Sequence, residues 1–206
     1  YEVKSFGRGV TFNDILYPEI SNYVPNGFVH DNSIKLTTSV RGISKTRHCN
    51  GNNFSENCID GVLDLDLNLI STDKFSLNSK VNFQSLSDRG TNFGEGISLG
   101  FKIAKEYSEN FSLSFGGENV IHFDDTIDLG RNFYLVASKY YVFPSKRTND
   151  PKILFLNAGV GSDFYGYRGN GFLGKTYCFG DNNLTGNGGN SCSWGPIGSL
   201  TLAFNK

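Results

Sequence analysis

The sequence predicts an all-β protein, an antiparallel up-and-down β-barrel of about eight strands with long, disulfide-stapled loops at one end. Three observations support this fold class. Apolar and polar residues alternate over long segments, long and short connections alternate along the chain, and the cysteines fall into close pairs within polar connections.

The alternation is strictest in residues 62–70, where Leu63 and Leu65 lie on one face and Asp64 and Asp66 on the other. Residues 75–84 repeat this pattern after a very short connection, which predicts a hairpin. The same reasoning predicts further strands at 33–42, 96–104, 111–115, 132–143, 152–161 and 197–205. Most of these segments are longer than the usual strand of about 5 to 6 residues.

The connections between these strands alternate in length. The short ones are 71–74, 105–110 and 144–151, and the long ones are 43–60, 86–95, 116–131 and 162–196. Successive connections of an antiparallel meander lie at opposite ends of the sheet. All long loops are therefore expected at one end.

Residues 1–30 are expected to form an irregular lead-in before a barrel domain of residues 31–206. Pro18, Pro25 and Asn26-Gly27 interrupt this segment, and residues 11–16 have a pattern that could start a short helical turn. No linker divides the rest of the chain.

The composition excludes several classes of protein. The chain has 19 Lys+Arg against 20 Asp+Glu, a net charge of -1, so a nucleic-acid partner is not expected. No apolar run approaches the ~18 residues of a membrane helix. With 18 Phe, 10 Tyr and 38% hydrophobic residues, the chain carries enough apolar surface to form an ordered core.

The cysteines are predicted to form two local disulfides, Cys49 with Cys58 and Cys178 with Cys192. Zinc sites favour tighter C-x2-4-C spacing with histidine partners, which these pairs lack. Disulfides indicate an exported, oxidising compartment. The chain contains no methionine, not even at position 1, so we expect that it either lost a leader by processing or was trimmed at its start.

The alternating strands and the loop asymmetry resemble the pattern of outer-membrane β-barrels, which have short periplasmic turns and long external loops. Aromatic residues beside the short turns fit the aromatic girdle of that class: Phe75, Tyr107, Phe111, Tyr140, Tyr141, Phe143 and Phe204. Such barrels usually end on an aromatic residue, whereas here Asn205 and Lys206 follow Phe204. The resemblance implies an outer-membrane or extracellular-surface location and a lipid bilayer as partner. It also implies a polar lumen lined by Lys35, Arg41, Asp64, Asp66, Lys80 and Lys102.

A soluble protein could show the same alternation, because the apolar face of a β-sandwich meets a second sheet rather than lipid. The alternative is therefore a secreted or virion-surface β-sandwich that functions by self-assembly or partner binding. The two interpretations exchange inside and outside for every strand.

No enzyme, cofactor or metal site is predicted. His122 with Asp124 and Asp125 is the one crowding of histidine and carboxylates, and solvated loop charges explain it equally well. Residues 181–185 begin like a calcium loop, but Cys192 occupies the position of the closing acidic ligand.

The last long loop is a candidate recognition surface for a protein partner or a second copy of the chain. Its aromatic and arginine side chains are Phe164, Tyr165, Tyr167, Arg168, Phe172, Tyr177 and Trp194. With about eight strands, the lumen should be filled by its own side chains. The predicted function is thus a non-enzymatic structural, surface-binding or narrow pore protein.

Overall fold

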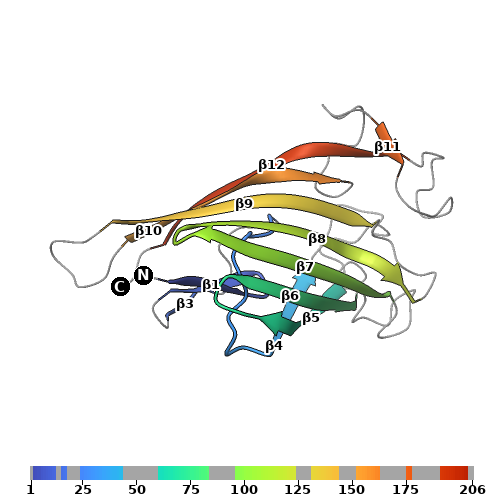
Figure 1. Cartoon of the computed structure of the whole chain (residues 1–206). Helices are drawn as coiled ribbons and strands as arrows, with labels where there is room; N and C mark the ends of the chain where they lie inside the picture. Colours follow the sequence, from blue (N-terminus) through green and yellow to red (C-terminus); the bar gives the residue numbers. More distant parts are fainter. Residues whose placement is uncertain are drawn as a thin grey trace.

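The computed structural model describes residues 2–12, 15–17, 24–43, 60–83, 96–123, 131–143, 152–162, 175–177 and 191–203. It is all-β, with antiparallel strand pairing in both of its sheets (Figure 1). Within these residues, no helix has the length and apolar character needed to cross a membrane.

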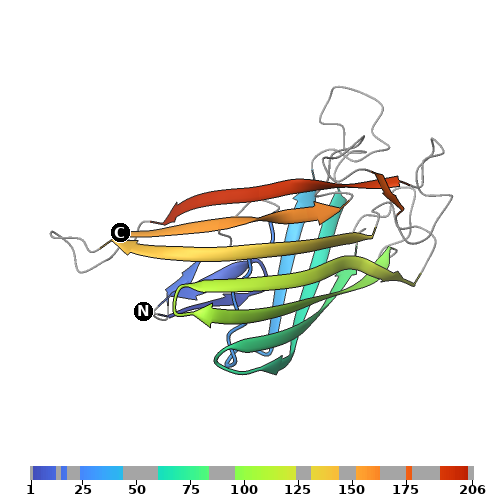
Figure 2. The ribbon, with the colours of Figure 1, turned by 45° about the horizontal axis from the view of Figure 1, so that its top comes forward.

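The larger sheet contains nine strands in the order β11-β12-β10-β9-β8-β7-β6-β5-β4. Its strands are β4 (Leu36–Ile43), β5 (Asp60–Ser71), β6 (Phe75–Phe83), β7 (Ile97–Ser108), β8 (Phe111–His122), β9 (Asn132–Phe143), β10 (Lys152–Ser162), β11 (Lys175–Tyr177) and β12 (Ser191–Ala203). Neighbours in sequence are neighbours in space, except that β12 pairs with both β10 and β11. The sheet curves into a trough (Figures 1 and 2).

Every strand predicted from alternation is present, but several are longer than predicted. The alternation of β8 breaks after Gly116, where its register to β7 shifts between Phe101 and Leu99. Asn119 lies within this irregular stretch and has a φ of 54°. A bulge therefore carries the strand on to His122, into a segment expected to be a loop.

The closed barrel is not found. In the described part of the chain, β4 pairs only with β5, and no pairing joins β4 to β12. The far edge of β12 is partly covered by β11, through Ser191 to Ser193. The two edge strands lie on opposite rims of the trough in Figure 1.

The lead-in forms strands rather than the irregular segment and helical turn expected there. A smaller sheet contains β1 (Val3–Phe6), β2 (Gly9–Phe12) and β3 (Ile15–Tyr17), in that order. Phe6 pairs with Gly9 across a two-residue turn that begins with Gly7, whose φ is 52°. Glycine is preferred at this position of tight hairpin turns. The short helical turn expected at 11–16 is not found, because residues 11 and 12 belong to β2 and residues 15 and 16 to β3.

The lead-in packs against the concave face of the large sheet. One apolar cluster joins the two sheets: Val3, Val10, Phe12, Phe28, Tyr140, Ile153 and Phe155. Phe28 contacts the rings of both Tyr140 and Phe155 edge to face, at centroid distances of 6.1 Å. The interior is thus filled by the lead-in, not only by the side chains of the strands as expected.

Candidate functional site

The two faces of the large sheet differ in character. The concave or inner face buries large apolar side chains on β9 and β10, among them Val136, Tyr140, Ile153 and Phe155. Elsewhere along the sheet its buried side chains are mainly small and polar: Ser76, Asn78, Asn82, Ser98, Ala104, Ser112, Ser114, Ser138 and Asn157. The convex or outer face carries large apolar side chains that are substantially exposed: Val40, Leu67, Leu69, Ile103, Phe115, Leu135, Leu200 and Leu202. Among the described residues, the lead-in with strands β1 to β3 packs on the inner face, and no element covers the apolar outer face.

Small side chains on the inner face make room for the lead-in. The Gly27 amide donates a hydrogen bond of 2.6 Å to Ser138 Oγ. A Cβ at Gly27 would lie only 2.9 Å from the Val136 carbonyl oxygen and 3.1 Å from that of Ser112. The backbone of the lead-in is therefore seated directly on strands β8 and β9.

A buried ionic cluster links the lead-in to the other half of the trough. Lys80 Nζ lies 3.6 Å from Asp64 and 3.1 Å from Glu118, and Arg8 lies 3.8 Å from the same Glu118 carboxylate. The Asp64 side chain is only 1% exposed and also accepts a hydrogen bond from Asn82. Strands β5, β6 and β8 each supply one charge, and the lead-in supplies the fourth.

Lys102 contacts the lead-in through hydrogen bonds. Its ammonium donates to Asn26 Oδ1 at 2.9 Å and to Ser5 Oγ at 3.2 Å. Asp66 lies beside the β1–β2 turn, where a Cβ at Gly7 would be 3.2 Å from its Oδ2. These charges border a cavity of about 40 Å³, room for roughly three water molecules at ~10–15 Å³ each.

His30 fixes the end of the lead-in. Its amide donates to Ser76 Oγ at 3.0 Å, and its carbonyl accepts from Ser71 Oγ at 2.8 Å. Burial lowers the pKa of the imidazole, outweighing a hydrogen bond with the Asp31 carbonyl that acts to raise it. The neutral ring is therefore the favoured form at this position.

The other predicted lumen residues lie on β4 or just before it. Lys35 is exposed and lies immediately ahead of β4. Arg41 pairs with Val62 through the backbone, and its side chain lies outside the described part of the structure.

Most loop predictions fall outside the described residues. This holds for Cys49, Cys58 and Cys178, and for Phe164, Tyr165, Tyr167, Arg168 and Phe172. Cys192 is described by its backbone only and pairs with Thr176 of β11. Tyr177 pairs with Ser191, and Trp194 pairs with Ser162 and is partly exposed. The two disulfides and the recognition loop stay predictions.

Sequence reasoning missed the lead-in partners of the interior, above all Arg8 and Asn26. A signal was available in residues 3–12, where Val3, Ser5, Val10 and Phe12 mark two short alternating runs around Gly7. Glu118 was missed because it lies in a segment expected to be a loop. Across the described ranges, no group of histidine, cysteine and acidic side chains could hold a metal ion.

Comparison with known proteins finds no family model, no curated protein and no solved structure that matches this chain. The geometry of the interior and of the outer face is therefore the basis for a functional assignment.

Proposed function

We propose that this chain is a non-enzymatic β-barrel protein of an outer membrane, with a lumen filled by its own lead-in and long loops that present a binding surface. One observation carries the proposal: the face of the sheet that bears the charged and most of the polar side chains is buried, and the opposite face exposes large apolar side chains. A soluble fold places these faces the other way round. Lipid is the environment in which a wide apolar outer surface is stable.

The filled interior favours a structural or surface-binding role over conduction. The apolar cluster holds the lead-in on one side, and the ionic cluster and Lys102 bind it on the other. Positive and negative side chains of the interior, Arg8, Lys80 and Lys102 against Asp64, Asp66 and Glu118, balance one another. No open polar path is therefore part of the proposal.

In the membrane, β4 and β12 are proposed to pair and close the sheet. Val40 of β4 and Leu200 of β12 are the most exposed large apolar residues of the described chain, at 68% and 69%. Unpaired backbone groups are strongly unfavourable in hydrocarbon, so lipid favours closure more than water does. The pairing would be antiparallel, as between every neighbouring pair of strands in the meander.

Closure is tested by cysteine cross-linking between inner-face positions, Ser39→Cys combined with Ser199→Cys or Thr201→Cys, in membrane-inserted protein. A disulfide found by peptide mapping in one of these pairs is the expected result. Ser39→Cys with Ser112→Cys is the control that should not cross-link. If no β4–β12 pair forms in inserted protein, closure is wrong.

The membrane assignment is tested by fractionation and by a gel of heated and unheated detergent samples. The protein should fractionate with membranes and migrate as a compact species unless it is heated. In addition, Leu65→Arg should impair insertion by about 2 to 4 kcal/mol, because the outer face meets lipid. Asp66→Asn on the inner face is the matched comparison and should insert nearly normally.

The runner-up is a secreted or virion-surface β-sandwich that assembles with copies of itself. Two open edges in the described part of the chain favour it, that of β4 and the length of β12 that β11 does not cover, because open edges recruit further strands. A soluble, oligomeric protein that shows no heat-dependent shift would support this alternative and contradict the membrane proposal.

A further inference from the structure

The outer face carries a repeated lysine–tyrosine pair near the short turns. In β7, Lys105 Nζ lies 5.1 Å from the centroid of the Tyr107 ring, and in β9 Lys139 Nζ lies 5.2 Å from that of Tyr141. In both strands the lysine precedes the tyrosine by two residues, so both side chains leave the same face of the sheet. The tyrosines thus hold the two ammonium groups against the apolar surface.

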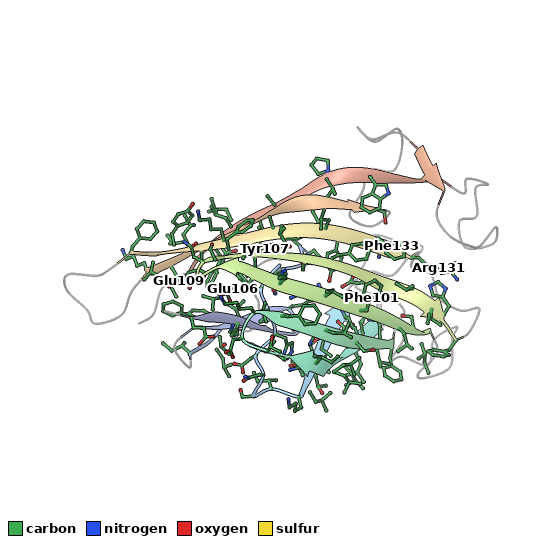
Figure 3. The ribbon with its side chains drawn as sticks, viewed as in Figure 1. Phe101, Glu106, Tyr107, Glu109, Arg131 and Phe133 are labelled. Atoms are coloured by element: carbon green, nitrogen blue, oxygen red, sulfur yellow. The ribbon has the colours of Figure 1, made fainter. Side chains whose placement is uncertain are left out.

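Strand β8 joins the two pairs into one row. The Phe111 ring lies 6.5 Å from the Tyr107 ring, and Phe111 pairs with Lys139 across the β8–β9 ladder. We call this row the lysine–aromatic belt: Lys105, Tyr107, Phe111, Lys139 and Tyr141. Figure 3 shows Tyr107 at the short-turn end of β7, well away from Phe101 and Phe133.

The belt is distinctive in its charge. On the described strands β4 to β10 and β12, the charged side chains at outward positions are Lys105, Lys139 and Lys152. Lys152 pairs with Phe143 and extends the same end of the outer face to β10. Glu106 points inward to Lys4, and Glu109 lies in the turn beyond the belt. Toward the long loops, outward positions are apolar.

We infer that the lysine–aromatic belt binds the phosphate groups of anionic phospholipids and so sets the short-turn end of the protein in an anionic leaflet. This inference rests on the proposed membrane function. Tyrosine rings take the headgroup level of a bilayer, and long lysine side chains reach from apolar surface into that layer. Positive charge at this level selects anionic over zwitterionic lipid.

The test uses quenching of an engineered tryptophan by brominated lipids. Phe111→Trp, in a Trp194→Phe background, reports on lipid at the belt in reconstituted protein. Dibrominated phosphatidylglycerol should quench the fluorescence of this tryptophan more strongly than dibrominated phosphatidylcholine does. Lys105→Gln and Lys139→Gln should each lower this preference about fivefold, whereas Lys105→Arg and Lys139→Arg should keep it.

The outcomes separate this inference from the proposal on which it rests. Equal quenching by the two lipids in inserted protein, or a preference that both glutamine variants retain, would overturn the belt and leave the membrane assignment intact. Failure to reconstitute, with no quenching by either lipid, would contradict the membrane assignment itself. Inorganic phosphate at millimolar concentration should leave the preference unchanged, because the site recognises phosphate held at a lipid surface.

Discussion

The lead-in meets the two halves of the trough in different ways. Under β9 and β10 the contact is apolar, with Phe12, Phe28 and Phe155 each 1% exposed or less. Under β5 to β8 the contact is ionic and hydrogen-bonded, through Arg8, Lys102 and their partners. Apolar burial supplies most of the free energy, whereas buried polar contacts are costly unless each partner is present. The first half is therefore expected to hold the lead-in, and the second to fix its register.

The largest expected effect comes from the apolar half. Phe12→Ala should lower the free energy of unfolding by about 4 kcal/mol, because it leaves a cavity against Tyr140. Urea unfolding of the folded protein, followed by the fluorescence of Trp194, the single tryptophan, measures this loss of stability. Phe115→Ala on the outer face is the control and should cost much less. Equal losses would mean that the lead-in does not contribute to the core.

In the polar half, Asp64→Asn should destabilise the protein by about 2 kcal/mol. The substitution keeps the size of the side chain but removes the charge facing Lys80. The same unfolding measurement applies, with Asp73→Asn in the exposed β5–β6 turn as the control. An unchanged stability would show that the ionic cluster is not a fixed contact.

At the boundary between the halves, Gly27→Ala should cost roughly 1 to 3 kcal/mol through overpacking. A methyl group there would press on backbone carbonyls that cannot rotate away. Gly198→Ala is the matched control, because a Cβ there would meet one near atom, the Asn157 carbonyl oxygen at 3.2 Å, whereas a Cβ at Gly27 would meet three atoms at 2.9 to 3.1 Å. If Gly27→Ala is as stable as the native protein, the lead-in is not seated on β8 and β9 as described.

The smallest effect is a pH dependence from His30. Because its folded pKa lies below the ordinary value of 6.5, the unfolded chain takes up protons first as the pH falls. The contribution of His30 to stability should therefore decline as the pH falls below about 6.5, a range in which Asp31, with its lowered pKa, stays ionised. Unfolding of His30→Gln should be flat over this range. A slope that persists in His30→Gln would assign the pH dependence to another group.

The strands of the large sheet could mostly be predicted from the sequence, because strict alternation of apolar and polar residues, as in 62–70, indicates a β-strand. The faces were also predictable, although alternation alone does not say what covers each one. The extension of β8 to His122 was not predictable, because Gly116, Gly117 and Asn119 interrupt the alternation of apolar and polar residues at a bulge. The filling of the interior by the lead-in was not predictable either. Arg8 and Glu118 lie far apart in the sequence, and only the curvature of the sheet brings them together.

The position of the lead-in also constrains the order of folding. Gly27 contacts Ser138 across 111 residues of sequence, and Lys102 contacts Ser5 across 97. Contacts this distant form slowly, because a long chain must be ordered before they contribute. The lead-in precedes the strands of the large sheet in the chain, yet it is among the last segments to reach its final neighbours. Until β9 is in place, the hairpin of β1 and β2 has no Tyr140 ring against which to bury Phe12, so this apolar segment stays uncovered during the early steps of folding.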